Sequence, residues 1–185
     1  MITVCFTGHR PDKLGGYDWH TEKNKRIITK LKDEIVKLIN DTDDNHFRFI
    51  CGGALGIDQM AFAVCKYIKL HTLKLNPVEI KIVLAMPFEK QACKWFNKDD
   101  VNRFNQQRRD TDEVVLVDTL EEYQCKIAPV GDYHVSKMEL RNRYMVDQSD
   151  KIIAVWNGTK GGTYNCVRYA KQKGREIIRL NPDEI

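Results

Sequence analysis

Short, continuous hydrophobic runs alternate with amphipathic patterns along almost the whole chain. The runs are rich in Val and Ile and do not alternate with polar residues, which is typical of strands buried on both faces of a parallel sheet. They are Ile2–Phe6, Phe47–Cys51, Ile80–Ala85, Glu113–Val117, Lys151–Trp156 and Glu176–Leu180. We therefore predict six strands in a mostly parallel sheet.

Helical patterns separate these runs. Two segments repeat apolar residues every three or four positions, which gives each an apolar stripe. These stripes are Ile27, Leu31, Ile35 and Leu38, and Ile57, Ala61, Val64 and Ile68. Three further helices are expected over Asp99–Arg109, from Ser136 onward, and from about Thr163 to Lys173, before Gly174.

The alternation of strands and helices predicts one doubly wound α/β domain over residues 1–185, Rossmann-like, with helices on both faces of the sheet. The fourth helix is expected to start at Ser136, because Ser136-x-x-Glu139 is a capping-box pattern. Thr119–His134 has no clear period and is predicted to be a long connection, of the kind that often forms a lid or binding element.

Composition and charge narrow the class of protein. The chain has 185 residues, 42% hydrophobic and 30% charged, which argues against disorder. Lys and Arg outnumber Asp and Glu by 30 to 26, a net charge of +4. This excess suits a small anionic ligand, and DNA stays an alternative that the small charge disfavours. With no run of about 18 apolar residues and no signal-peptide pattern, we expect a cytoplasmic protein with no membrane partner.

The six cysteines are scattered and form no C-x-x-C pair, so we expect reduced thiols, with Cys5 and Cys51 buried in neighbouring strands. The five histidines are equally dispersed, and no H-E-x-x-H is present. We therefore predict neither a metal site nor a bound cofactor.

Candidate chemistry follows the first and second strands, at the edge where open α/β sheets bind ligands. Gly8, His9 and Arg10 combine a sharp turn with positive charge, although an ordinary turn with solvated charges is the alternative. The second turn carries Gly52, Gly53, Gly56 and Asp58. Its glycines allow close backbone approach, and the following helix offers free amides to an anion. The spacing is neither G-x-G-x-x-G nor a P-loop, and Asp58 would either complement the helix dipole or accept from a sugar hydroxyl.

The fifth strand is followed by a second glycine-rich turn, Lys160-Gly161-Gly162-Thr163. Two such turns at strand ends would face each other across a crevice, and two tight turns without a ligand are the alternative. On the preceding helix, Arg141 would either reach the crevice and bind phosphate through two guanidinium N–H groups, or belong to a solvated charged face. Neither Gly162 nor Arg141 is expected to lie in the core.

Several motifs together resemble the YpsA-like family of the SLOG superfamily, which also holds DprA and the LOG phosphoribohydrolases. They are Thr7-Gly8-His9-Arg10-Pro11, Leu14-Gly15-Gly16-Tyr17, Gly52-Gly53-Ala54-Leu55-Gly56-Ile57-Asp58 and Gly161-Gly162-Thr163. The resemblance extends from Thr7 to the last helix and implies a Rossmann-like sheet that binds nucleotides or their derivatives. Relatives in the superfamily often dimerise, so by analogy a homodimer is compatible with the sequence.

The second half also resembles the LOG pattern R-K-x-x-M-x-x-x-S-D followed by P-G-G-x-G-T-x-x-E. Residues at matching spacing are Arg141, Met145, Ser149, Asp150, Gly162 and Thr163. Asn157 replaces the proline, and Cys166 stands where LOG enzymes carry their catalytic glutamate. A neutral thiol cannot replace a carboxylate in glycosidic cleavage, so no catalytic residue is assigned.

We predict a cytosolic protein that binds a small phosphorylated nucleoside derivative, for sensing or sequestration. Amides of the two glycine turns would hold phosphate, Arg10, Arg141 and Lys160 would neutralise it, and Asp58 would accept from a ribose hydroxyl. The alternatives are an N-glycosidic nucleotide hydrolase of the LOG type and a DprA-like protein associated with DNA.

Overall fold

Six parallel strands form one sheet in the order β4-β3-β2-β1-β5-β6 in the computed structural model, which describes residues 1–72 and 78–185. The strands are β1 Ile2–Gly8, β2 His46–Cys51, β3 Glu79–Met86, β4 Glu113–Leu116, β5 Lys151–Val155 and β6 Glu176–Leu180. The predicted strands are confirmed, and every neighbouring pair is parallel.

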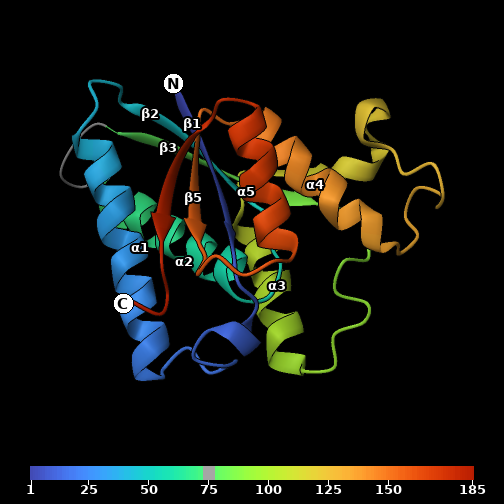
Figure 1. Cartoon of the computed structure of the whole chain (residues 1–185), viewed down its shortest axis with the longest axis horizontal. Coiled ribbons are helices and arrows are strands. Elements are labelled where there is room, and N and C mark those ends of the chain that lie inside the picture. Colours follow the sequence, from blue (N-terminus) through green and yellow to red (C-terminus); the bar gives the residue numbers. More distant parts are fainter. Residues whose placement is uncertain (73–77) are drawn as a thin grey trace.

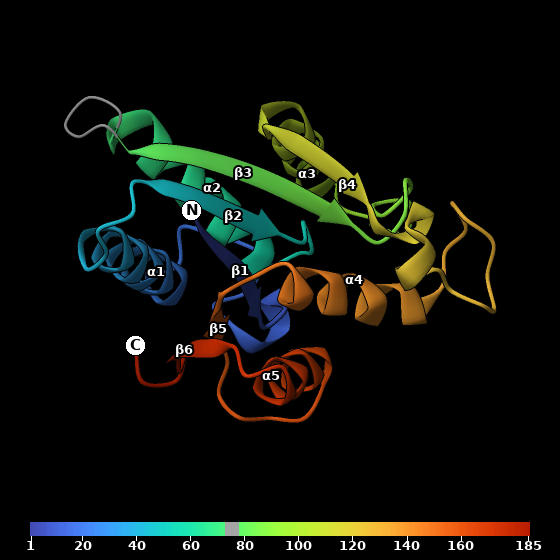
Figure 2. The same cartoon turned by 90° about the horizontal axis from the view of Figure 1, so that it is seen from above.

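Five α-helices cover the two faces of this sheet (Figures 1 and 2). They are α1 Glu22–Asn40, α2 Ile57–Thr72, α3 Lys98–Asp110, α4 Val135–Asp147 and α5 Gly162–Gln172. Helices α1, α2 and α3 pack on one face, and α4 and α5 pack on the other. Within the described residues, none of these helices is long and apolar enough to cross a membrane.

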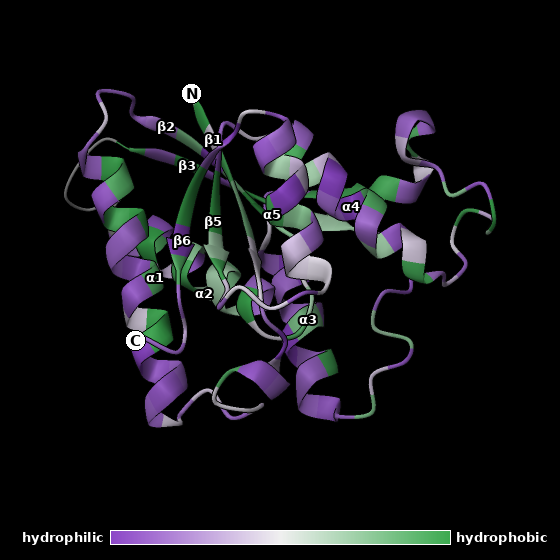
Figure 3. Ribbon diagram, viewed as in Figure 1, coloured by the Kyte–Doolittle hydropathy of each residue, from purple (hydrophilic) through white to green (hydrophobic). Residues whose placement is uncertain are grey.

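Successive residues of each central strand enter two different cores. In β1, Val4 and Phe6 pack with α1 and α2, whereas Cys5 packs with α4 and α5. Figure 3 shows hydrophobic strands at the centre and helices that are hydrophilic on their outer sides. Both faces of the strand are dry, which explains why the strands are continuous hydrophobic runs in the sequence. As expected, Cys5 and Cys51 are buried thiols on neighbouring strands.

Helix α4 is capped two residues earlier than the capping-box pattern indicates, since that pattern makes Ser136 the N-cap. His134 is the N-cap, with extended backbone, and its Nδ1 accepts from the Ser136 amide at 3.2 Å. Ser136 is therefore already inside the helix, and Glu139 pairs with Arg143 at 2.6 Å instead of returning to an amide. The predicted capping box is wrong because the histidine ring takes the position of the capping oxygen.

The connection before α4 is anchored by a buried ion pair. Lys137 on α4 and Asp118 are 1% and 2% exposed, and their charged atoms lie 2.9 Å apart. Lys137 also donates to the Pro129 carbonyl at 2.5 Å, and Asp118 accepts from the Gly131 amide at 2.7 Å. The predicted connection Thr119–His134 contains the last residue of a short 3-10 turn, Val117–Thr119, and a second such turn, Glu121–Tyr123, and otherwise forms no helix or strand.

The strand order creates a switch point between β1 and β5. From β1 the chain builds β2, β3 and β4 on one side, then returns to place β5 on the other side of β1. The helices that follow β1 and β5, α1 and α5, lie on opposite faces of the sheet and leave room beyond the ends of these strands. Ligands of open α/β sheets bind at such a point.

Candidate functional site

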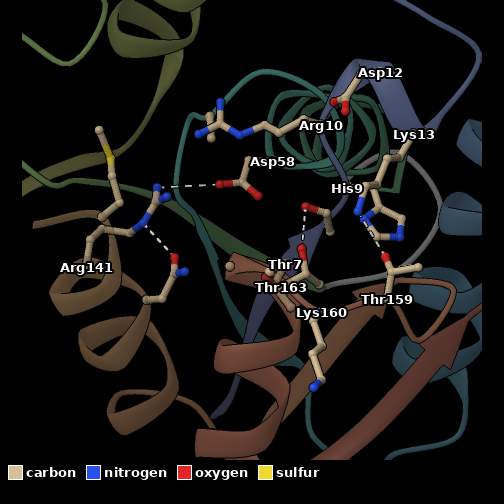
Figure 4. Close-up of a pocket in the computed structure, with 16 residues that line it drawn as sticks. Thr7, His9, Arg10, Asp12, Lys13, Asp58, Arg141, Thr159, Lys160 and Thr163 are labelled. Atoms are coloured by element: carbon tan, nitrogen blue, oxygen red, sulfur yellow. Dashed lines mark hydrogen bonds and ion pairs between the residues drawn. The ribbon is translucent and has the colours of Figure 1, made fainter. Parts of the chain in front are cut away.

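A cavity of about 210 Å³ opens at the switch point, beyond the ends of β1 and β5 (Figure 4). We call it the β1/β5 cavity. It is lined by Thr7, Gly8, His9, Arg10, Asp12, Lys13, Ala54, Asp58, Met138, Arg141, Asn142, Thr159, Lys160, Gly161, Gly162 and Thr163. The end of β1, the start of α5 and the turns that follow β1 and β5 supply eleven of these sixteen residues, and Ala54, α2 and α4 supply the other five.

Most of the residues that the sequence singled out meet in this cavity. Those that line it are Gly8, His9, Arg10, Asp58, Arg141, Lys160, Gly161, Gly162 and Thr163. The other three, Gly52, Gly53 and Gly56, do not belong to the lining.

The three glycines after β2 lie outside the lining and allow close packing of the residues around the cavity. A Cβ at Gly52 would collide with the Arg141 guanidinium, and one at Gly53 would lie 2.8 Å from the Phe104 ring. Gly56, with φ of +93°, lets the His9 carbonyl approach closely enough to accept from the Ile57 amide at 3.3 Å. The turn after β2 is thus closely packed against its neighbours.

The turn after β5 presents open backbone to the cavity. A Cβ at Gly161 or Gly162 would meet no other heavy atom within 4 Å. Helix α5 begins at Gly162, so its first amides have no partner within the helix. Thr163 Oγ1 donates to the Gly8 carbonyl at 2.9 Å, which ties this helix end to β1. An anion in the cavity would reach these amides and the positive end of the helix dipole.

Positive charge surrounds this helix end. Arg10, Lys13 and Lys160 are exposed and line the cavity together with the buried Arg141. Among the described residues, Arg141 alone of these four has a carboxylate partner within 4.0 Å. Lys13 donates to Thr159 Oγ1 at 3.1 Å, which holds the two turns together. Four cations against the two carboxylates of the lining favour an anionic ligand.

Arg141 is part of the cavity wall, and the expectation that it lies outside the core is wrong. It is 3% exposed, and its guanidinium donates to the Gly52 carbonyl and lies 3.5 Å from Asp58 Oδ2. Burial lowers the pKa of Arg141, and the Asp58 carboxylate opposes that shift. Burial also raises the pKa of Asp58, which is 7% exposed, against the effect of Arg141 and Arg10. The pair is thus a buried, charged element of the fold.

Asn157 connects the two turns that border the cavity. In the sequence it stood out only because the LOG pattern has a proline at this position. Its Oδ1 lies 2.7 Å from His9 Nε2 and accepts from both the amide and the hydroxyl of Thr159, at 3.2 and 2.9 Å. Its Nδ2 donates to Asp183 at 2.9 Å. These bonds hold the turn after β5 against the turn after β1 and against the C-terminal segment. A proline ring would stiffen the same turn without them.

Cys166 is separated from the cavity. It lies in the second turn of α5, is 4% exposed, packs in the same core as Cys5, and does not belong to the cavity lining. Burial raises the pKa of this thiol to about 11, although Thr7 and Arg141 lower it. The thiol is therefore neutral at physiological pH.

The strand order and the cavity at the switch point define a Rossmann-like α/β protein. The chain belongs to the YpsA family, described as the YspA SLOG family, whose sequence model matches residues 4–184. It is 39% identical over 165 residues to the uncharacterized SPbeta prophage-derived protein YoqJ of Bacillus subtilis (strain 168), which covers 87% of this chain and 92% of that protein. A UPF0398 protein of Bacillus cereus is 23% identical, over 94% of this chain and 85% of its own length.

Two solved structures share the fold. The X-ray structure of DNA processing protein A (DprA) from Streptococcus pneumoniae superposes with a TM-score of 0.61 at 16% identity, and DprA from Helicobacter pylori with 0.54 at 19%. Each comparison covers 97% of this chain, which spans 50% of the first DprA chain and 65% of the second. The Helicobacter structure concerns the single-stranded DNA binding mode of that protein. At these identities the likeness shows a shared fold.

Proposed function

We propose that this protein binds a small phosphorylated nucleoside derivative in the β1/β5 cavity, for sensing or sequestration. The observation that carries the proposal is the open N-terminus of α5, where a side chain at Gly161 or Gly162 would meet empty space. This open helix end lies among cationic side chains. Free amides and positive charge at a helix N-terminus are the arrangement that binds phosphate.

Different lining residues contact different parts of the ligand in this proposal. Amides at Gly162 and Thr163 hold the phosphate, and the flexible chains of Arg10 and Lys160 neutralise it. Arg141 contributes charge from the wall, where its Nη1 is held by the Gly52 carbonyl and Asp58 and its Nε donates to Asn142 Oδ1 at 3.0 Å. Asp58 is an acceptor for a sugar hydroxyl, since one carboxylate oxygen faces Arg141 and the residue still lines the cavity.

Titration calorimetry with AMP and ADP-ribose tests this proposal. We expect wild type to bind, and Lys160→Ala to weaken binding by about 1 kcal/mol, roughly fivefold, because one exposed charge next to the phosphate is lost. Lys171→Ala is the matched control, since Lys171 is exposed on the same helix and does not line the cavity. Equal weakening by both variants would indicate a general charge effect, and absence of binding to wild type would refute the proposal.

Glycosidic cleavage is a separate question, and we predict that wild type releases no free base from purine nucleoside monophosphates. A buried neutral thiol at Cys166 neither activates water nor stabilises positive charge as a carboxylate does. Cys166→Glu alone is also expected to be inactive, because position 166 lies outside the cavity lining. Chromatography of the reaction mixture checks both proteins, and base release at about one per second or faster would contradict the prediction.

DNA is the competing ligand, given the likeness to DprA. Non-specific binding of single strands combines a basic groove with aromatic side chains that stack on bases. We expect at most weak, salt-sensitive binding to short single strands. Tight binding at physiological salt, with no response to AMP or ADP-ribose, would support the DprA-like alternative instead.

A further inference from the structure

The β1/β5 cavity has an unusual lining for a nucleotide site. None of the described residues that line it is Phe, Tyr or Trp. Its one imidazole belongs to His9, which is 5% exposed and lies 2.7 Å from the Asn157 side chain. Ala54 and Met138 are the only apolar side chains in the lining. The cavity therefore offers many polar groups and no flat apolar surface for a base.

Trp156, at the end of β5, and Trp19 both lie outside this lining. Trp156 packs on Tyr164 with ring centroids 6.0 Å apart, and its Nε1 donates to the Thr159 carbonyl at 2.8 Å. The Arg103 guanidinium lies over the Trp19 ring, with Cζ 4.4 Å from the ring centroid. Trp19 lines a different cavity. Trp156 thus stabilises the turn after β5, and neither Trp156 nor Trp19 belongs to the lining of the β1/β5 cavity.

The volume of the cavity also favours a ligand part smaller than a whole nucleotide. At about 210 Å³ it is smaller than the roughly 300–1,000 Å³ of cavities that enclose drug-sized ligands. The open helix end at Gly162 and the carboxylate of Asp58 both belong to the lining. The phosphate and hydroxyls of a phosphorylated pentose match these two kinds of group.

We propose that the β1/β5 cavity selects the phosphorylated pentose of its ligand and leaves the nucleobase outside. This inference rests on the proposed function and defines its ligand class as 5′-phosphorylated pentoses, with or without an attached base. Where proteins stack bases on aromatic rings, each stacked base changes affinity by roughly fivefold to more than a hundredfold. This cavity provides no such ring, so the base contributes little and its identity does not matter.

Calorimetric titration of the whole protein with a matched ligand set tests the inference. The set is AMP, GMP, CMP, UMP, ribose 5-phosphate, adenosine and inorganic phosphate. We expect the four nucleotides to bind within about threefold of one another, and ribose 5-phosphate within about tenfold of AMP. Adenosine, which lacks the phosphate, is expected not to bind.

Met138→Ala distinguishes contacts to the nucleobase from contacts to the phosphorylated pentose. Met138 is the longer of the two apolar side chains in the lining. If the base stays outside, the substitution changes the affinities for AMP and ribose 5-phosphate by the same factor. Loss of AMP binding alone would place the base on Met138 and overturn the inference.

The outcomes separate this inference from the proposed function. A preference of more than about tenfold for one base, or binding of adenosine as tight as that of AMP, overturns the inference and leaves nucleotide binding intact. Failure of every phosphorylated ligand to bind refutes the proposed function and the inference together.

Discussion

Replacing Arg141 by alanine is expected to lower the free energy of unfolding by about 3–5 kcal/mol. The substitution leaves the Asp58 carboxylate buried without its partner, 3.5 Å away in wild type, and removes one of the two donors to the Gly52 carbonyl, the other being Gln91 Nε2. An unpaired buried charge is costly because the interior solvates it poorly. The substitution therefore lowers the stability of the fold in addition to its effect on ligand binding.

The loss should depend on pH with a defined sign. Burial already raises the pKa of Asp58 in the folded protein, and Arg141 is the largest opposing influence. Without Arg141 the folded-state pKa rises further above the unfolded value. A raised pKa means that the folded state binds the proton more tightly, so stability increases as the pH falls through that pKa. The deficit of Arg141→Ala is thus largest near neutral pH and shrinks in acid.

Urea unfolding at several pH values measures this deficit. Arg143→Ala is the matched control, because Arg143 is on the same helix in an exposed pair with Glu139, and such pairs contribute only about 0–1 kcal/mol. Adding Asp58→Asn to Arg141→Ala should recover part of the loss at neutral pH. Equal stability of wild type and Arg141→Ala at pH 7 would show that the buried pair does not stabilise the fold.

Gly162→Val is expected to abolish ligand binding, weakening it at least roughly a hundredfold. The added Cβ meets no heavy atom of the surrounding protein within 4 Å, so in the proposed binding mode the new side chain would take the space of the phosphate beside the α5 amides. Losing two charge-assisted hydrogen bonds of about 1.5 kcal/mol each accounts for this factor. The fold should survive, because no neighbouring atom lies within 4 Å of the added Cβ.

Titration of three proteins with AMP tests this expectation. Asn165→Val places the same β-branched residue one turn later on α5, at an exposed position outside the cavity lining, and should bind as wild type does. Thermal unfolding of both variants checks that the fold persists. Undiminished binding by a folded Gly162→Val protein would mean that the phosphate site lies elsewhere.

The sequence by itself determined the strands, the helices and the class of fold. These features depend on local patterns, such as the unbroken apolar run of β3 or the stripe from Ile27 to Leu38, which remain visible without knowledge of the partners. Helix ends were less certain, and the start of α4 was misassigned because a histidine caps it in place of Ser136. The family motifs also located the glycine turns, since each follows a recognisable strand.

Only the tertiary structure decided what these motifs do. Gly52 and Gly162 look alike in sequence, but the first faces Arg141 and the second faces empty space. Arg141 proved to be a buried partner of Asp58, and Asn157 joins the turns after β1 and β5. Arg141 meets Gly52 and Asp58, more than 80 positions away, because α4 packs on the sheet, and Asn157 meets His9 because β5 pairs with β1. Local sequence patterns do not specify these side-chain contacts, because the contacts depend on how helices and strands distant in sequence pack together.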